Sequence, residues 1–474
     1  MLTNNVSDEL SLGDSRHEVL EYAADLVEQV WRQFDTPRDK EPEISPELSK
    51  LFQQSIPQFP SDPIANLDLA VEALHASIAQ CRPRFLAYIG GSGMEMGALA
   101  DLLAHSFDAN LAIDAGAASR IEEQAIQWIG EFVNYPVTLG FFTSGGTISN
   151  ITALAAARER ALPGSRASGL ANSRAAIYCS AEAHYSIVRA VELLGLGSNS
   201  IRDIPIDHER RMQPHLLRAA IEADRAEGIT PIAVVATAGT TLTGAVDPLA
   251  AIADVCNEFG VWMHVDGAYG LPAAASSRGP LFAGLDRADS VSVDAHKWMF
   301  VPKACSAILV RDPAALAQTF SHNAAYVPHE GDRINAVDAT LEYSRPLRAL
   351  KLWMALRVHG ATAFRQALQR NIDQADLLYD LAAAHPRFEV LPHRPQLSIV
   401  PIRHLAPGCT DPDQHNARLA SAIVADNRLY ISPAAIDGHQ WLRPCFTNFR
   451  TQEVDVRATI DIVDEIGSGL CERH

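Results

Sequence analysis

Two strand-like segments, each ending in a polar cluster, constrain the fold of this chain more than any other feature. The first is VWMHVDGAYG (261–270), and the second is SVSVDAHKWM (290–299). Each begins with β-branched and apolar residues, as buried parallel strands do, and then presents charged side chains at its carboxyl end. Because open α/β sheets bind ligands at that edge, we expect Asp266 and Lys297 to face one site from neighbouring strand ends.

A lysine and a carboxylate in this arrangement suit pyridoxal 5′-phosphate. A lysine amine with an ordinary pKa of ~10.4 is a poor nucleophile at neutral pH, but it becomes reactive when linked to an aldehyde as a Schiff base. The pyridine ring of the cofactor then accepts electrons, provided that a buried carboxylate keeps its nitrogen protonated. We therefore predict that Lys297 carries the cofactor and Asp266 faces its ring nitrogen. Taken singly, Lys297 can be a solvated loop lysine and Asp266 a strand-end cap.

A glycine-rich junction supplies the expected phosphate site. The segment VTLGFFTSGGTISNITALAAARERAL (137–162) predicts a strand, a turn and a helix. Hydroxyls and bare amides at a helix N-terminus bind anions, so we expect Gly146 and Thr147 to hold the cofactor phosphate. The pattern matches neither GxGxxG nor GxxxxGK[ST], which disfavours dinucleotide and nucleoside triphosphate sites. An ordinary capped turn is the alternative.

Four further polar residues lie at predicted strand ends or helix starts. His184 precedes a helix within 175–195, where an imidazole can stack on a pyridine ring or be purely structural. Thr240 follows another buried strand and can bond the cofactor ring or its phosphate side. Asp247 is interpreted as the N-cap of a helix that begins with proline. Arg443 can meet a carboxylate, or pair at the surface or between domains.

The order of elements predicts the fold class. Strands and helices alternate from about 137 to 311, which predicts a mainly parallel sheet with helices on both faces. We expect three regions: an N-terminal helical arm (1–80), a large cofactor-binding domain (81–370) and a small C-terminal α/β domain (371–474). Apolar residues at helical spacing predict an amphipathic helix over 15–35. The arm is expected to pack on another subunit or on its own domain.

One long polar segment is a candidate for a lid. Residues 316–346 lack periodicity and exceed the usual length of a connection, which predicts a lid or a disordered loop. Tyr326 lies within it. A phenol with a pKa near ~10 can protonate a carbanion in a closed, dry site, although Tyr326 can also serve loop packing. The segment that follows, 346–385, predicts a long, bent helix that leads into the C-terminal domain.

Composition excludes several classes of function. The formal net charge of −18 argues against nucleic acid as a partner, because a phosphate-binding face needs clustered basic residues. No apolar run approaches the ~18 residues of a membrane span, and the first twenty residues lack the apolar core of a signal peptide. Seven cysteines without CxxC spacing favour reduced thiols over a disulfide framework or a zinc site. A cytoplasmic protein without a metal centre or a membrane partner follows.

These motifs resemble the group II pyridoxal-dependent amino-acid decarboxylases, the family of the aromatic-amino-acid, glutamate, histidine and diaminobutyrate enzymes. The resemblance covers roughly 80–450, and its most specific motifs are HVDGAYG and DAHKW, supported by TSGGTISN, AEAHYS and AGTTLTG. It implies a pyridoxal-phosphate enzyme of fold type I. It also implies a homodimer with the active site at the subunit interface, because the family's mobile loop reaches into the other subunit's site.

The resemblance implies a role for each matching residue. Lys297 becomes the Schiff-base lysine, Asp266 the pyridinium partner and His184 the stacking imidazole. Tyr326 falls where the family's decarboxylases carry the loop tyrosine that protonates the substrate carbon. The implied cofactor contacts are Gly146, Thr147, Thr240, Asp294 and His296.

The chain departs from the family pattern at several places. Ala295 stands where the family commonly has proline before His-Lys, and Gly267 and Leu271 interrupt the common HVDAAYGG. None of these changes removes a reacting group. The segments 88–91 and 109–114 match, loosely, those that form aromatic or bulky walls in the aromatic enzymes, and here they are mixed. We prefer an aromatic amino acid as substrate and keep glutamate, aspartate and diaminobutyrate as alternatives.

The predicted reaction is α-decarboxylation of an L-amino acid to its amine and carbon dioxide. Decarboxylation coupled to oxidative deamination, which yields an aldehyde, is possible on the same fold, but a tyrosine rather than a phenylalanine at 326 argues against it. A catalytically silent scaffold protein is the alternative from another class. The presence of Lys297 argues against that alternative.

Overall fold

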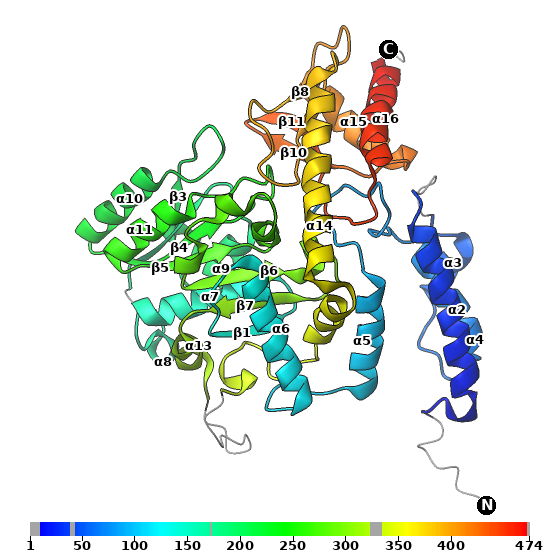
Figure 1. Cartoon of the computed structure of the whole chain (residues 1–474), viewed down its shortest axis with the longest axis horizontal. Helices are drawn as coiled ribbons and strands as arrows, with labels where there is room; N and C mark the ends of the chain where they lie inside the picture. Colours follow the sequence, from blue (N-terminus) through cyan, green and yellow to red (C-terminus); the bar gives the residue numbers. More distant parts are fainter. Residues whose placement is uncertain (1–9, 38–42, 171–172, 323–333, 472–474) are drawn as a thin grey trace, which may run out of the picture.

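The computed structural model describes residues 10–37, 43–170, 173–322 and 334–471, and Figure 1 shows a central sheet, a smaller C-terminal sheet and an arm of helices. The central sheet has seven strands in the order β1-β7-β6-β5-β4-β2-β3. Only β7 runs antiparallel to its neighbours. The strands are β1 (Leu139–Thr143), β2 (Ala175–Ser180), β3 (Ile201–Ile204), β4 (Thr230–Thr237), β5 (Trp262–Asp266), β6 (Ser290–Asp294) and β7 (Ser306–Val310).

Helices cover both faces of this sheet, as the sequence predicts. Alternate residues of β4 show why: Val234 and Ala236 belong to one apolar cluster, whereas Ala233 and Val235 belong to the other. The first cluster includes residues of α6 (Ala117–Val133), α10 (Pro214–Ala226) and α11 (Leu249–Phe259). The second includes residues of α7 (Gly146–Ala161), α9 (Ser186–Leu193) and α13 (Pro313–Phe320). The predicted mainly parallel sheet between two helical layers is confirmed.

A long helix joins the central sheet to the C-terminal region. Helix α14 (Ala349–Ala384) is interrupted at Gly360, whose backbone (φ 75°, ψ 150°) is not helical, so the predicted bend is confirmed. The helix runs through residue 370, and the domain boundary expected there stays a prediction. The C-terminal sheet has the order β10-β11-β9-β8. Its elements are β8 (Phe388–Val390), β9 (Ile402–His404), α15 (Pro412–Asp426), β10 (Ser432–Ile436), β11 (His439–Arg443) and α16 (Glu453–Cys471).

The N-terminal arm lies to one side of the body, beside α5 (Glu95–Phe107) (Figure 1). Its helices are α2 (Arg16–Phe34), α3 (Pro46–Leu51) and α4 (Pro63–His75). The predicted helix over 15–35 is confirmed as α2, and the hydroxyl of Tyr22 donates to Asp68 at 2.6 Å to join α2 to α4. Val19 is the one buried residue of α2, and other residues of its apolar face, among them Leu26 and Val30, are half-buried.

Asp247 is a correction to the sequence interpretation. Helix α11 begins at Leu249 with Pro248 at its N-cap position, and no side chain caps it. Asp247 instead turns inward, where its carboxylate accepts from the backbone N–H groups of Thr237 (2.7 Å) and Met212 (2.7 Å). Burial raises the pKa of Asp247 to about 6. The prediction of an N-cap was wrong because two buried backbone amides, at the end of β4 and in the segment before α10, use this carboxylate as their acceptor.

The predicted lid is described only in part. Helix α13 ends at Phe320 and a short 3₁₀ turn covers Ala336–Asp338, but residues 323–333 lie outside the described residues. Tyr326, the expected proton donor, is among them. Within the described ranges, no helix combines the length and the hydropathy that crossing a bilayer requires.

Candidate active site

A cavity of about 480 Å³ lies at the carboxyl ends of β4, β5 and β6. Asp266 and Lys297 both line it, together with Gly146 and Thr147 from the start of α7. His184 lines it from the loop before α9. The sheet order explains this assembly, because β5 and β6 are adjacent and parallel and therefore end side by side.

Lys297 is held by an ion pair. It lies in the single turn that follows β6, and its Nζ is 2.9 Å from Oδ2 of Asp294. Burial lowers the pKa of Lys297, but the charge of Asp294, its hydrogen bond to the amine and the charge of Asp266 together hold the pKa above its ordinary value. Burial likewise raises the pKa of Asp294, but the charge of Lys297, together with His296 and hydrogen bonds to the carboxylate, holds that pKa below its ordinary value. The amine is therefore a charged ammonium with a base in hydrogen-bond contact.

Asp266 is surrounded by donors. Its Oδ1 accepts from the backbone N–H of Ala268 (3.1 Å) and from the hydroxyl of Ser292 (3.2 Å). Its Oδ2 accepts from the amide nitrogen of Asn150 at 2.9 Å. The side chain is buried, with 6% of its surface exposed, yet it lines the cavity. Three neutral donors orient this carboxylate without cancelling its charge.

The turn at the start of α7 has the close packing that an anion cradle needs. A Cβ at Gly146 would lie 2.9 Å from Cβ of Ala268 and 3.1 Å from Oδ2 of Asp294, so glycine is required there. Behind the turn, hydroxyls are linked from Thr143 to Ser149 (2.8 Å) and on to Ser306 (2.9 Å). This buried chain fixes the N-terminus of the helix against β7.

Two imidazoles border the cavity in neutral form. Nδ1 of His184 accepts from the backbone N–H of Ser186 at 3.2 Å, and its ring lies 4.1 Å from the ring of Tyr185 between centroids. His296 lies 2.9 Å through Nδ1 from the carbonyl oxygen of Cys305. Burial lowers the pKa of both His184 and His296. Both rings are therefore uncharged near neutral pH.

The structure does not bring every candidate to the cavity wall. Thr240 is fully buried in the turn after β4, where its hydroxyl pairs with Thr243 (3.1 Å) and accepts from the N–H of Ala245 (3.1 Å). Its neighbours Gly239 and Thr241 line the cavity instead. Of the two expected wall segments, 88–91 contributes residues 88 and 89, whereas 109–114 contributes none to this cavity.

Sequence reasoning missed or undervalued several cavity residues. Asn150, Ser186 and Thr237 line the cavity, but no role is predicted for any of them from the sequence, although Asn150 ends the motif TSGGTISN and Ser186 ends AEAHYS. Arg443, for which surface pairing was one option, is 5% exposed, lines the cavity from β11 and donates to the carbonyl of Thr241 at 2.8 Å. Only the long-range contact between the C-terminal sheet and the turn after β4 brings it there.

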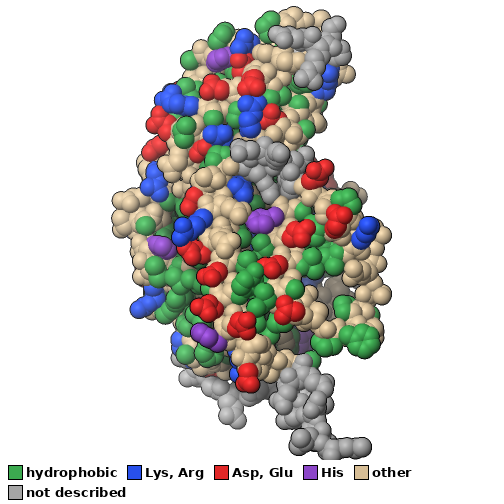
Figure 2. All heavy atoms as spheres, turned by 90° about the vertical axis from the view of Figure 1, so that its right-hand side faces the viewer, with side chains coloured by type: hydrophobic (Ala, Val, Ile, Leu, Met, Phe, Trp, Pro, Cys, Tyr) green, Lys and Arg blue, Asp and Glu red, His purple; other side chains and the backbone are tan. Residues whose placement is uncertain are grey.

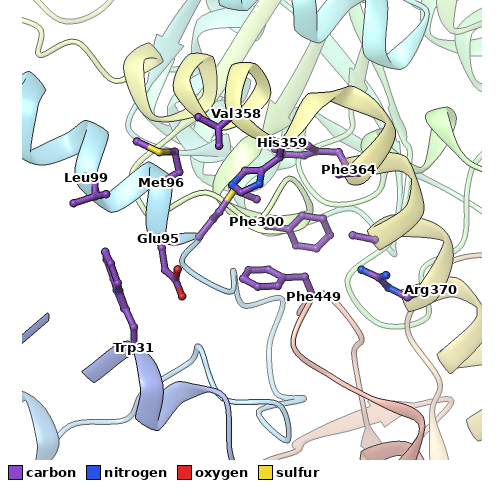
Figure 3. Close-up of a pocket in the computed structure, with 13 residues that line it drawn as sticks. Trp31, Glu95, Met96, Leu99, Phe300, Val358, His359, Phe364, Arg370 and Phe449 are labelled. Carbon is purple, nitrogen blue, oxygen red and sulfur yellow. The ribbon is translucent and has the colours of Figure 1, made fainter. Parts of the chain in front are cut away.

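A second cavity of about 390 Å³ lies away from these groups, between the arm and the body (Figure 3). Trp31 of α2 faces the start of α5 across it, and Phe300 and Phe449 form its inner wall (Figure 3). Val358 and Phe364 border it on either side of the break in α14. Its lining is mainly apolar and includes none of the site residues named above.

The chain matches the family model described as "Pyridoxal-dependent decarboxylase conserved domain" over residues 46–403. The chain belongs to the pyridoxal-dependent decarboxylase family. It is 33% identical to an aromatic-L-amino-acid decarboxylase of Bacillus atrophaeus, over 94% of each chain, and 27% identical to a phenylacetaldehyde synthase of Petunia hybrida, over 93% of this chain and 91% of that one. Family members catalyse pyridoxal-phosphate-dependent decarboxylation, so this enzyme is an amino-acid carboxy-lyase.

Solved structures of other decarboxylases share the fold. The crystal structure of Oryza sativa TDC with PLP and tryptamine superposes on this chain with a TM-score of 0.88 at 25% identity. The match covers 97% of this chain and 98% of that one. Mouse CSAD superposes with a TM-score of 0.89, also at 25% identity, covering 96% and 99%. Fold type I and the pyridoxal 5′-phosphate cofactor of this decarboxylase follow from these relationships.

The residues present fit that cofactor. An amine, a carboxylate and a helix N-terminus lie around one cavity, and they match the aldehyde, the ring nitrogen and the phosphate of the molecule. Two buried oxygens beside the cavity, Oδ1 of Asp294 and the hydroxyl of Thr237, have no hydrogen-bond partner among the described residues. Both belong to side chains that line the cavity of this decarboxylase.

Proposed function

We propose that Lys297 carries the cofactor of this amino-acid decarboxylase, that Asp266 faces the ring nitrogen, and that Gly146 and Thr147 hold the phosphate. The observation that carries the proposal is the shared cavity: the ammonium of Lys297, the carboxylate of Asp266 and the first residues of α7 all border it. When bound, the cofactor supplies a conjugated ring that accepts the electron pair left by departing carbon dioxide.

The side chains around the cavity then divide the work. Lys297 must lose a proton before its amine can react, and the ion pair with Asp294 at 2.9 Å holds it as an ammonium until the cofactor binds. Asp266 keeps a proton on the ring nitrogen. His184, neutral and bordering the cavity, covers a face of the ring, and His296 contributes a wall. Tyr326, for which only the family resemblance argues, returns a proton to the substrate carbon.

We propose an aromatic L-amino acid as the substrate. Of the three described tyrosines that border the cavity, Tyr269 is buried, whereas Tyr88 and Tyr185 are 56% and 59% exposed and stand at its mouth. Arg443 places a guanidinium in the same cavity, which suits the substrate's α-carboxylate. The Bacillus relative, an aromatic-amino-acid enzyme by name, points in the same direction.

Aldehyde formation is the second candidate because two relatives are named aldehyde synthases: the phenylacetaldehyde synthase of Petunia hybrida and a 4-hydroxyphenylacetaldehyde synthase of Rhodiola rosea. That reaction consumes oxygen and releases ammonia and hydrogen peroxide. Incubating the holoenzyme with phenylalanine, tyrosine, tryptophan, glutamate and diaminobutyrate, with amine, aldehyde and peroxide measured together, separates the candidates. Amine from aromatic substrates without peroxide is the expected result. Turnover of glutamate or diaminobutyrate alone would contradict the aromatic proposal.

Borohydride reduction tests the cofactor lysine directly. The chain has only five lysines, at positions 40, 50, 297, 303 and 351, so a reduced adduct is readily mapped by peptide mass. Lys303 and Lys351 are internal comparisons, because they are engaged with Gln80 (2.6 Å) and Asp101 (2.7 Å) away from the cavity wall. We expect the adduct on Lys297. An adduct on any of the other four would remove Lys297 from its role.

We also propose that the enzyme is a homodimer. Helix α5 packs Gly97, Ala100 and Ala104 toward the body, yet its opposite side exposes a second apolar stripe. The stripe comprises Leu99, Leu102, Leu103 and Phe107, which are 41%, 56%, 47% and 84% exposed. Figure 2 looks onto the side of the molecule on which the arm lies, where hydrophobic side chains gather between acidic ones. A second copy of the chain would cover the stripe and the mouth of the second cavity, which Leu99 also borders.

Sedimentation velocity tests the dimer. Phe107→Asp and Leu102→Asp should yield monomers, whereas Val454→Asp, at a 64% exposed residue of the C-terminal region, should leave the oligomer intact. A wild-type monomer at micromolar concentration would contradict the proposal.

We further place the enzyme in the cytoplasm, since six described cysteines are free thiols. Cell fractionation checks this placement.

A further inference from the structure

A chain of buried hydrogen bonds runs behind Asp266. Asn150, in the second turn of α7, is 1% exposed. Its amide nitrogen lies 2.9 Å from Oδ2 of Asp266 and 2.9 Å from the hydroxyl oxygen of Ser186. Its amide oxygen lies 2.9 Å from Nε2 of His264. On the other side of that ring, Nδ1 lies 2.9 Å from the hydroxyl of Ser290.

The chemistry of these groups assigns every proton in the chain. An ionised carboxylate only accepts, so the amide of Asn150 must turn its nitrogen toward Asp266 and its oxygen toward His264. Nε2 of His264 must then carry the hydrogen, which leaves Nδ1 to accept from the hydroxyl of Ser290. That hydroxyl in turn accepts from the indole N–H of Trp262 at 2.9 Å. The donors therefore all point one way, from Trp262 to Asp266.

The members of the chain are neutral and dry. His264, Ser290 and Trp262 have at most 1% of their surface exposed. Burial lowers the pKa of His264 to about 4, so its ring carries no charge near neutral pH. A cation behind Asp266 would cancel the carboxylate's charge, whereas a neutral amide fixes its direction and leaves the charge to act on the cavity.

We propose that Asn150, oriented by His264, is a positioning residue that aims the charged carboxylate of Asp266 at the cofactor's ring nitrogen. This inference rests on the proposed roles of Lys297 and Asp266. Asn150 itself performs no chemical step. It acts by supplying a donor on the protein side of Asp266, which keeps the carboxylate from rotating away from the cavity.

Two substitutions separate aiming from packing. Asn150→Asp keeps the shape but turns the donor into an acceptor facing Asp266, and Asn150→Leu removes the hydrogen bonds at similar volume. Loss of a hydrogen bond to a charged group predicts that both variants bind pyridoxal phosphate roughly ten- to a hundredfold more weakly, with Asn150→Asp the weaker binder. A packing role alone predicts the reverse order. Thr152→Val, at a buried residue of the same helix whose hydroxyl bonds only to the helix carbonyl of Ile148 (2.8 Å), is the matched control.

Nitrogen-15 NMR of histidine-labelled apoenzyme provides a readout that needs neither cofactor nor turnover. The His264 signals are assigned by their loss in His264→Phe. We expect the Nε2–H tautomer in the wild type and a shifted tautomer equilibrium in Asn150→Leu. A wild-type ring protonated on Nδ1, or unchanged cofactor affinity in both Asn150 variants, would overturn the inference. Failure of the proposed function itself looks different, because wild-type enzyme would then show no borohydride adduct on Lys297.

Discussion

Nζ of Lys297 lies 2.9 Å from Oδ2 of Asp294, three residues earlier in the chain, at the edge of the cavity that holds Asp266. The pair keeps Lys297 protonated beside the proposed aldehyde-binding site. An ammonium group does not attack carbonyls, so the lysine does not react with other aldehydes while it is paired. The pair also neutralises a carboxylate that would otherwise face the anion cradle at Gly146. One ion pair thus keeps the lysine protonated and also removes a negative charge from the proposed phosphate site.

Removing the counter-charge should change the pH at which the lysine reacts. Because Asp294 holds the pKa of Lys297 above its ordinary value, Asp294→Asn should lower that pKa and shift cofactor attachment toward lower pH. Stopped-flow absorbance of apoenzyme mixed with pyridoxal phosphate across pH 6–10 checks this. Asp101→Asn is the matched control, since it breaks the analogous pair with Lys351 (2.7 Å) away from the cavity wall. An unshifted profile in Asp294→Asn would mean that the pair does not govern reactivity.

Lys297→Ala should abolish amine formation while leaving the chain folded. Lys303→Ala, in the same loop, removes a lysine that bonds Gln80 (2.6 Å) and should retain activity. Carbon dioxide release and circular dichroism on both variants check this. Substantial turnover by the Lys297 variant would sink the proposed role.

Gly146→Ala should weaken phosphate binding. The added methyl group would lie 2.9 Å from Cβ of Ala268 and 3.1 Å from Asp294, and such overpacking costs about 1–3 kcal/mol. Gly145→Ala is the comparison, because its Cβ would meet nothing within 4 Å and its backbone is extended. Equilibrium dialysis should show a clearly larger loss of cofactor affinity at 146 than at 145. Equal losses would argue against a close-packed cradle.

Tyr326→Phe should divert product from amine to aldehyde, because the substrate carbon would lose its proton donor. The ratio of the two products, measured by chromatography with peroxide assayed in parallel, decides the point. Tyr343→Phe, at a 45% exposed tyrosine that does not line the cavity, should keep the wild-type ratio. An unchanged ratio in the Tyr326 variant would contradict the proposed proton donor.

The buried imidazole of His264 should make the fold sensitive to mild acid. Burial lowers its pKa to about 4 from an ordinary value near 6.5, so the unfolded chain binds the proton more readily. Stability is then complete above pH 6.5 and falls as the pH drops toward 4, by up to about 3 kcal/mol. Urea unfolding of the wild type and His264→Phe at pH 4.5 and 7 should show a smaller pH difference in the variant. If the free energy of unfolding changes equally with pH in both proteins, His264 is not the source of the acid sensitivity.

Local patterns predicted the sheet and the pair at its edge. The strands β5 and β6 are short segments that contain apolar residues and end directly in a carboxylate, so Asp266 and Lys297 could be placed by chain order alone. The same reasoning found Gly146 and Thr147, because a strand, a glycine turn and a helix are contiguous. These features depend on neighbours within ten residues.

Contacts between distant segments escaped prediction. Asn150 meets His264 and Asp266 only once α7 packs across β5, and Arg443 reaches the cavity from the C-terminal sheet. Asp247 had the chain position of an N-cap, but the orphan amides that claimed it belong to β4 and to the segment before α10. For such residues the deciding partner is far away in sequence, and residue type alone does not identify it.

The spacing of two residues on helix α7 limits which insertions and deletions this enzyme can accept. Gly146 at its first position and Asn150 one turn later are about 6 Å apart along a stiff rod, given the rise of an α-helix. In the proposed site Gly146 contacts the phosphate and Asn150 orients the carboxylate at the ring, so the rigid helix would fix the distance between these two contacts. Inserting a single residue between them would rotate Asn150 by about 100° around the helix axis, so that the contacts proposed for Gly146 and Asn150 could no longer be made together. A change in the length of this turn would therefore disturb both positions together, whereas a substitution at Gly146 or Asn150 disturbs one of them.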